Sequence, residues 1–162
     1  MLFLCTGNSA RSILAERLLE HRGRGRFRGF SAGSRPKGVV HPLALDLLRR
    51  MQLPVEGLSS KSWDRFAPAS APPLDLVITV CDDAASEICP VWPGGPMTAH
   101  WGIPDPAAAT GSDADRRQAF EKAWDALDRR IRALVALPIE TLNPTQLRER
   151  ITAIGRQPDS DA

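Results

Sequence analysis

The sequence predicts an α/β protein in which a parallel β-sheet lies between two layers of helices. Short apolar runs, typical of buried parallel strands, alternate along the chain with stretches whose apolar residues repeat at helical spacing. Alternation of this kind favours right-handed strand–helix–strand units over a purely helical or purely β protein. The expected architecture is therefore a three-layer sandwich built from one parallel sheet.

Four segments have the pattern of strands. Leu2, Phe3 and Leu4 form the first apolar run, and the later segments are residues 26–33, 75–80 and 97–101. Only four residues precede Cys5, so the sequence leaves open whether the first strand is truncated. The Pro-rich stretches 67–73 and 90–96 are predicted to be loops.

The helices are predicted from apolar residues that recur every three or four positions. A first helix follows the first strand, and the others have apolar faces made by Val40, Ala44, Leu47, Leu48 and Met51, then Phe120, Trp124, Leu127, Ile131 and Leu134, and finally Leu147, Ile151 and Ile154. Ser112 with Asp115, and Asn143 with Gln146, are expected to cap the last two helices, and Gly155 to end the chain's last helix. The polar tail after Arg156 is expected to fray.

Size and charge restrict the classes of function. A chain of 162 residues suits one domain with a real core, and a net charge of +2 argues against a dedicated nucleic-acid binder. The basic run at 21–29 is interrupted by glycines and fits a solvated helix end and turn. No apolar stretch approaches a membrane span and no signal-peptide pattern is present, so we expect a cytoplasmic protein. Three cysteines without an export signal favour free, reactive thiols.

The stretch "LFLCTGNSARSI" (2–13) joins the first strand to the first helix and contains the first cysteine. By itself Cys5 would be interpreted as a small buried residue. A loop before a helix N-terminus, however, directs backbone N–H groups and the helix dipole at one point, where Arg11 can bind two oxygens of a tetrahedral oxyanion. A cysteine there ionises more easily and becomes a nucleophile. The predicted oxyanion cradle is Thr6, Gly7, Asn8, Ser9, Ala10 and Arg11.

The other two cysteines follow the third strand. Cys5 and Cys81 both lie at carboxyl ends of parallel strands, which face one crevice, and neighbouring strands are about 4.8 Å apart. Residues 82–88 have the pattern of a short helix, which would separate Cys81 from Cys89 by about 12 Å along its axis. A disulfide needs Cα atoms within about 7 Å, so a Cys81–Cys89 bond would require this segment to unwind. The alternative is that Cys89 is an ordinary thiol before Pro90.

Asp105 is the candidate acid. Alone, Asp105-Pro106 is typical of a turn. On a loop opposite the cradle, its carboxyl group could protonate a departing oxygen.

These motifs resemble the low-molecular-weight protein tyrosine phosphatases, and more closely the thioredoxin-coupled arsenate reductases built on the same fold. The resemblance covers roughly residues 1–137 and is carried by "CTGNSARS" (5–12), the paired cysteines after the third strand, and "HWGIPDPA" (100–107). It implies a four-stranded parallel sheet of flavodoxin-like topology in the order 2-1-3-4. Residues 138–162 form an extension with a short helix and a polar tail, and this helix packs either on the domain or on a second subunit.

The resemblance also implies a mechanism. Cys5 attacks arsenate held by the loop and Arg11, Ser12 supports the thiolate, and Asp105 protonates the leaving oxygen. Cys81 then attacks Cys5 and arsenite is released. Cys89 attacks Cys81, and the resulting disulfide is reduced by thioredoxin.

The resemblance requires no organic cofactor, but it implies an external thiol reductant. Some members of the family bind potassium beside the loop, at positions that Asn8, Glu16, Ser31 and Asp64 match. Phosphate and sulfate are expected to bind as analogues of arsenate. The Cys81–Cys89 interval is one residue longer than in the thioredoxin-coupled members, and related reductases use glutathione with glutaredoxin or another small thiol.

The same residues are compatible with two other functions. One is hydrolysis of phosphotyrosine or another phosphomonoester by Cys5, Arg11 and Asp105 alone. Phosphatases of this type usually carry aromatic residues beside the Asp-Pro pair, whereas Ala107 and Ala108 follow it here. The other is a non-catalytic oxyanion sensor with regulatory thiols. The presence of Cys5, Arg11 and Asp105 together argues against this function.

Overall fold

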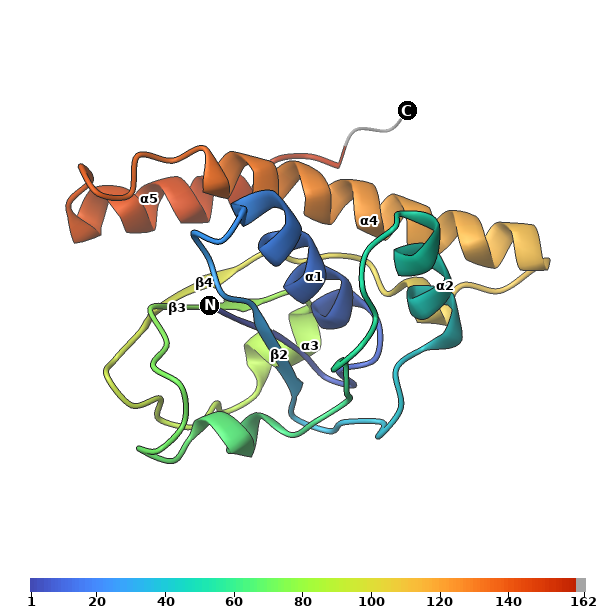
Figure 1. The fold of residues 1–162 in the computed structure, drawn as a ribbon, viewed down its shortest axis with the longest axis horizontal. Coiled ribbons are helices and arrows are strands. Elements are labelled where there is room, and N and C mark those ends of the chain that lie inside the picture. Colours follow the sequence, from blue (N-terminus) through green and yellow to red (C-terminus); the bar gives the residue numbers. More distant parts are fainter. Residues whose placement is uncertain (160–162) are drawn as a thin grey trace.

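A computed structural model describes residues 1–159 as a four-stranded, fully parallel sheet in the order β2-β1-β3-β4 (Figure 1). The strands are short: β1 is Leu2–Cys5, β2 is Phe30–Gly33, β3 is Leu76–Thr79 and β4 is Met97–His100. The predicted fold class and strand order are confirmed. The strand at 26–33 was predicted too long, because residues 26–29 only lead from the turn at Arg24 and Gly25, both with positive φ angles, into β2.

The strand β1 forms the centre of the sheet. All four of its residues pair with β2, and Leu2, Phe3 and Leu4 pair with β3, so the four-residue strand has neighbours on both sides. Its side chains alternate between the two faces: Phe3 enters one hydrophobic cluster, and Leu2 and Leu4 enter another. Burial on both faces explains why this segment is a continuous apolar run.

The two faces of the sheet are covered unequally. The helices α1 (Arg11–Gly23), α2 (Pro42–Arg50), α4 (Asp113–Val135) and α5 (Pro144–Gly155) all contribute to the larger cluster, and Figure 1 shows them gathered on one side. The opposite face is covered by the short 3-10 helix Trp63–Phe66 and by loop residues, including Leu74 and Trp92. The third layer is therefore thinner than the sequence pattern suggested.

The last helix packs on the domain itself. The indole N–H of Trp101, which follows β4, donates to the carbonyl of Ile151 over 3.0 Å, and Ile151 and Ile154 are buried in the larger cluster. Both predicted capping boxes are present, at Ser112–Asp115 and Asn143–Gln146. The division of the chain after residue 137 stays a prediction.

The expectation of a fraying tail is wrong for residues 157–159. The guanidinium of Arg130, 3% exposed, donates to the carbonyls of Gly102 and Gln157 and to the carboxylate of Asp159. These bonds tie the tail to α4 and to the loop after β4. Residues 160–162 lie outside the described part of the chain.

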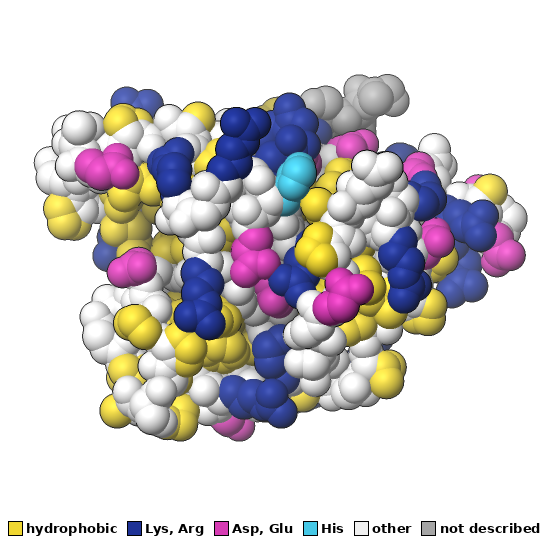
Figure 2. Space-filling model, viewed as in Figure 1, with side chains coloured by type: hydrophobic (Ala, Val, Ile, Leu, Met, Phe, Trp, Pro, Cys, Tyr) yellow, Lys and Arg dark blue, Asp and Glu magenta, His cyan; other side chains and the backbone are white. Residues whose placement is uncertain are grey.

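The surface carries charge of both signs. Figure 2 shows Lys and Arg side chains scattered over this face, with Asp and Glu among them. Across residues 1–159, no helix is both long enough and apolar enough to cross a membrane.

The contact between α5 and β4 depends on a residue without a side chain. A Cβ atom on Gly155 would lie 2.4 Å from the carbonyl oxygen of His100 and 2.5 Å from the Trp101 ring. Replacing a helical glycine by alanine normally stabilises by about 1 kcal/mol. We predict the opposite sign for Gly155→Ala, a loss of about 1–3 kcal/mol from overpacking, measured by urea unfolding. Thr152→Ala on the same helix is the control and should lose nothing; equal stability of both variants would contradict this packing.

Candidate active site

The loop between β1 and α1 is held in shape by the side chain of Asn8. This residue is fully buried and adopts a positive φ angle of 42°. Its side-chain oxygen accepts from the backbone N–H of Lys61 over 2.8 Å, and its amide nitrogen donates to Ser12 Oγ over 2.8 Å. The left-handed conformation turns the loop back toward the helix, and asparagine tolerates that conformation better than most residues. The loop is thereby closed around Cys5.

Cys5 lies at the floor of this loop, and the residue is 3% exposed. The backbone N–H of Asn8 donates to Cys5 Sγ over 3.2 Å, and Ser12 Oγ lies 2.9 Å from the same sulfur. Because Asn8 already donates to the Ser12 oxygen, the Ser12 hydroxyl proton is free to point at the sulfur. Two donors and the N-terminus of α1 therefore face one thiol, an arrangement that stabilises a thiolate.

Above the sulfur is a cavity of about 220 Å³ that carries mostly polar and charged side chains. Arg11 lies on one wall, where its guanidinium donates to the carbonyl of Ile103 over 2.9 Å and lies 3.5 Å from the carboxylate of Asp105. Asp105 begins a 3-10 turn and accepts from the N–H of Ala107 with its other oxygen. The predicted acid and the predicted anion-binding arginine thus meet at the mouth of the cavity.

Three further residues of this cavity were missed by sequence reasoning. Arg35 and Lys37 come from the loop after β2, and Asp83 comes from the helix after β3. Backbone bonds from Arg35 to Thr6 and from Lys37 to Gly7 fasten that loop to the cradle. The signal was present in "GSRPKG" (33–38), which places two cations directly after a strand whose carboxyl end faces the cradle.

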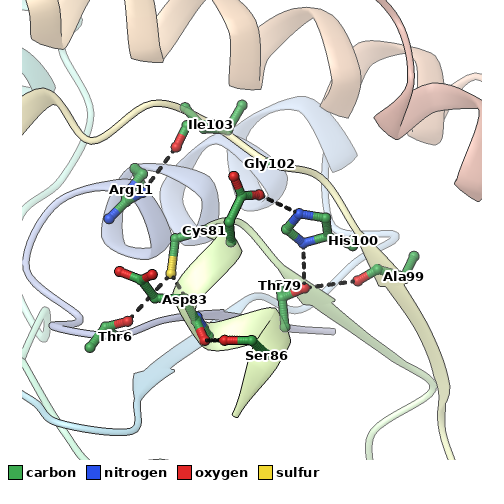
Figure 3. A network of polar contacts seen from close by, with 12 residues as sticks. Thr6, Arg11, Thr79, Cys81, Asp83, Ser86, Ala99, His100, Gly102 and Ile103 are labelled. Carbon is green, nitrogen blue, oxygen red and sulfur yellow. Dashed lines mark hydrogen bonds and ion pairs between the residues drawn. The ribbon is translucent and has the colours of Figure 1, made fainter.

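The structure brings Cys81 to the edge of the cradle. Its sulfur lies 3.5 Å from the hydroxyl of Thr6, the residue next to Cys5, and accepts from the N–H of Ala84 over 3.4 Å (Figure 3). Cys81 thereby caps the short helix α3, Asp82–Ser86. The prediction that the strand ends would place Cys81 beside the loop of Cys5 is confirmed.

Cys89 is not brought to Cys81 in this structure. The helix α3 ends at Ser86, two residues earlier than predicted, and Cys89 lies beyond it, half-buried against the hydrophobic cluster that contains Trp92. Cys81 belongs to the other cluster. Burial, with the nearby carboxylate of Glu87, raises the pKa of the Cys89 thiol. All three cysteines are free thiols.

Comparison with known proteins agrees with this geometry. Residues 1–149 match the family model described as low molecular weight phosphotyrosine protein phosphatase. The chain belongs to this family. An arsenate reductase of Halalkalibacterium halodurans is 34% identical over 130 residues, which cover 80% of this chain and 90% of that protein.

Solved structures of the family have the same fold. An arsenate reductase of Archaeoglobus fulgidus, 24% identical, superposes with a TM-score of 0.66 and covers 84% of this chain and 98% of its own. The thioredoxin-dependent arsenate reductase of Corynebacterium glutamicum is 26% identical with a TM-score of 0.61, covering 82% of this chain and 58% of its own.

The short helix α3 is joined to β4 by a series of polar side chains. The Asp82 carboxylate lies 2.8 Å from His100 Nε2, and Thr79 Oγ1 lies 2.8 Å from His100 Nδ1 (Figure 3). These side-chain contacts are exposed to solvent, so they contribute little to holding α3 against β4. Movement of α3 therefore requires these polar contacts to break and Ala84, fully buried in the larger cluster, to leave its packing.

Of the four residues that the family resemblance implies for potassium, three lie near one another beneath the loop. Ser31 donates to the carboxylate of Glu16 over 2.5 Å, and Asn8 is joined to them through Lys61. Burial is the main cause that raises the pKa of Glu16. Asp64 is exposed and accepts from Ser62, and none of the hydrogen bonds found within residues 1–159 joins it to this group.

We predict that Cys89 reacts slowly with iodoacetamide near neutral pH, because burial disfavours its thiolate. In a Cys5→Ser/Cys81→Ser variant, which leaves Cys89 as the only thiol, the rate–pH profile should lie at higher pH than that of the same variant unfolded in urea. Adding Glu87→Gln should move the folded profile part of the way back, since it removes the smaller of the two causes. A folded profile at or below the unfolded one would contradict the environment described here.

Proposed function

We propose that this protein reduces arsenate to arsenite through a relay of its three cysteines. The observation that carries the proposal is the second buried thiol, Cys81, held against the loop of the nucleophile. A phosphatase needs one thiol, whereas a reductase needs two electrons, which two thiols supply when they become a disulfide. The names of the curated relatives, arsenate reductases, support the same activity.

In the first step Arg11 and the backbone N–H groups of the loop bind arsenate in the cavity. Binding draws the guanidinium toward the oxyanion, which releases its contact with Asp105. The Cys5 thiolate attacks arsenic, an As–S bond forms, and one oxygen leaves as water with a proton from Asp105. Arsenic remains in its oxidised, pentavalent state.

In the second step the two electrons are transferred. The Cys81 thiolate attacks Cys5 Sγ and the As–S bond breaks, with its electron pair going to arsenic. Arsenic is thereby reduced to arsenite, and Cys5 and Cys81 are oxidised to a disulfide. The contact between Cys81 and Thr6 supports a short path for this attack.

In the third step Cys89 attacks Cys81 and releases Cys5 as a thiol. Because Cys81 and Cys89 pack in different hydrophobic clusters, α3 and the segment after it must rearrange. Ile88 and Val91, 96% and 92% exposed, flank Cys89, so little packing on either side opposes the rearrangement. The product disulfide reaches the surface, where thioredoxin in the cytoplasm is the proposed reductant.

The runner-up function is phosphomonoester hydrolysis, which the family's description and the Cys5–Arg11–Asp105 arrangement both favour. It uses neither Cys81 nor Cys89. Ala107 and Ala108 beside Asp105 offer no aromatic surface to hold a phosphotyrosine ring.

We predict that Cys89→Ser releases about one arsenite per protein chain and then stops, because the Cys5–Cys81 disulfide has no internal thiol to resolve it. Quantifying arsenite and mapping disulfides by mass spectrometry checks this outcome. Cys5→Ser is the matched control and should lower arsenite formation by about 1000-fold or more, since a hydroxyl is a poor nucleophile here. All thiols free in the arrested Cys89→Ser protein would contradict the relay.

A further inference from the structure

Beneath the cradle lies a buried charge that the proposed chemistry does not use. Glu16, on α1, is 8% exposed, and its partner Ser31, on β2, is fully buried. A buried carboxylate without a countercharge is costly, and a negative charge behind the loop would also oppose the thiolate of Cys5 and the bound oxyanion. A cation at this position would offset both costs.

The structure supplies that cation from its own chain. Lys61 Nζ donates to Ser31 Oγ over 3.5 Å and to the carbonyl of Ser59 over 2.8 Å, while Ser31 donates onward to Glu16. The hydroxyl of Ser31 thus bridges the ammonium and the carboxylate. Among the described residues, no other lysine or arginine donates a hydrogen bond to Ser31 or Glu16.

The same residue holds the loop through its backbone. The Lys61 N–H donates to the side-chain oxygen of Asn8, and its carbonyl accepts from the N–H of Gly33. Asn8 in turn contacts Ser12, and Ser12 contacts Cys5. Through its backbone, Lys61 is therefore two side chains away from the nucleophile, while its ammonium contacts Ser31 and Ser59.

This arrangement does not suit a potassium ion. Potassium binds through several oxygen atoms, but the Lys61 ammonium already donates to Ser31 Oγ and to the Ser59 carbonyl, and Asp64 lies outside the group. We propose that the Lys61 ammonium takes the place of a monovalent cation beneath the cradle. Lys61 is thus a positioning residue that makes the loop independent of potassium. This inference does not rest on arsenate reduction.

The test is thermal unfolding, which is independent of any activity. The wild-type protein should melt at the same temperature in potassium chloride and in choline chloride of equal ionic strength. Lys61→Met leaves the Glu16 carboxylate without its cation, so this variant should melt lower in choline chloride and recover by about 2–4 °C in potassium chloride. Lys122→Met, an exposed lysine on α4, is the control and should show neither effect.

Two results would overturn the proposal. A saturable, potassium-specific rise in the wild-type melting temperature would show that potassium still binds beneath the cradle, and this measurement decides even if Lys61→Met does not fold. If Lys61→Met melted at the wild-type temperature in both salts, the ammonium would have no role.

A double variant tests the same pairing from the other side. Combining Lys61→Met with Glu16→Gln should restore most of the lost stability, because the buried charge is then removed together with its cation.

Discussion

The hydrogen bonds of one buried side chain, Asn8, hold the catalytic loop in place. Its oxygen fastens the loop to the segment that precedes the 3-10 helix, and its amide fixes Ser12 beside Cys5. With these bonds made, the Asn8 N–H and the N-terminus of α1 face the sulfur, a preorganised arrangement that suits an incoming tetrahedral oxyanion. Arg11, Asp105 and Cys81, the groups proposed to act on bound arsenate or on Cys5, all line or adjoin this loop.

Strand order then determines which chemistry the loop can perform. Because β1 lies between β2 and β3, the segments that follow these two strands both reach the cradle. The segment after β2 brings Arg35 and Lys37, and the segment after β3 brings Cys81. In the proposed relay, a thiol at the end of one neighbouring strand turns a fold shared with phosphatases to reduction. The third thiol packs in a different hydrophobic cluster, so the proposal requires α3 to move.

The sequence was most informative where local patterns and topology act together. Apolar periodicity and capping residues located the strands and the long helices, and the rule that parallel strands share a carboxyl edge correctly placed Cys81 beside the loop of Cys5. It was least informative where contacts are distant in the chain. The tail's attachment depends on Arg130, a helix residue whose burial is decided by the tertiary fold. The role of Lys61 depends on a buried serine thirty residues away. Neither contact leaves a periodic signal.

The most direct test of the three-thiol relay is arsenate-dependent oxidation of NADPH with thioredoxin and thioredoxin reductase, run beside glutathione with glutaredoxin. The relay predicts turnover with thioredoxin, because the Cys81–Cys89 disulfide is delivered to the surface as its substrate. Turnover only with glutathione and glutaredoxin would keep a reductase but contradict the role of Cys89. No turnover with either system, together with hydrolysis of an aryl phosphate, would contradict the reductase itself.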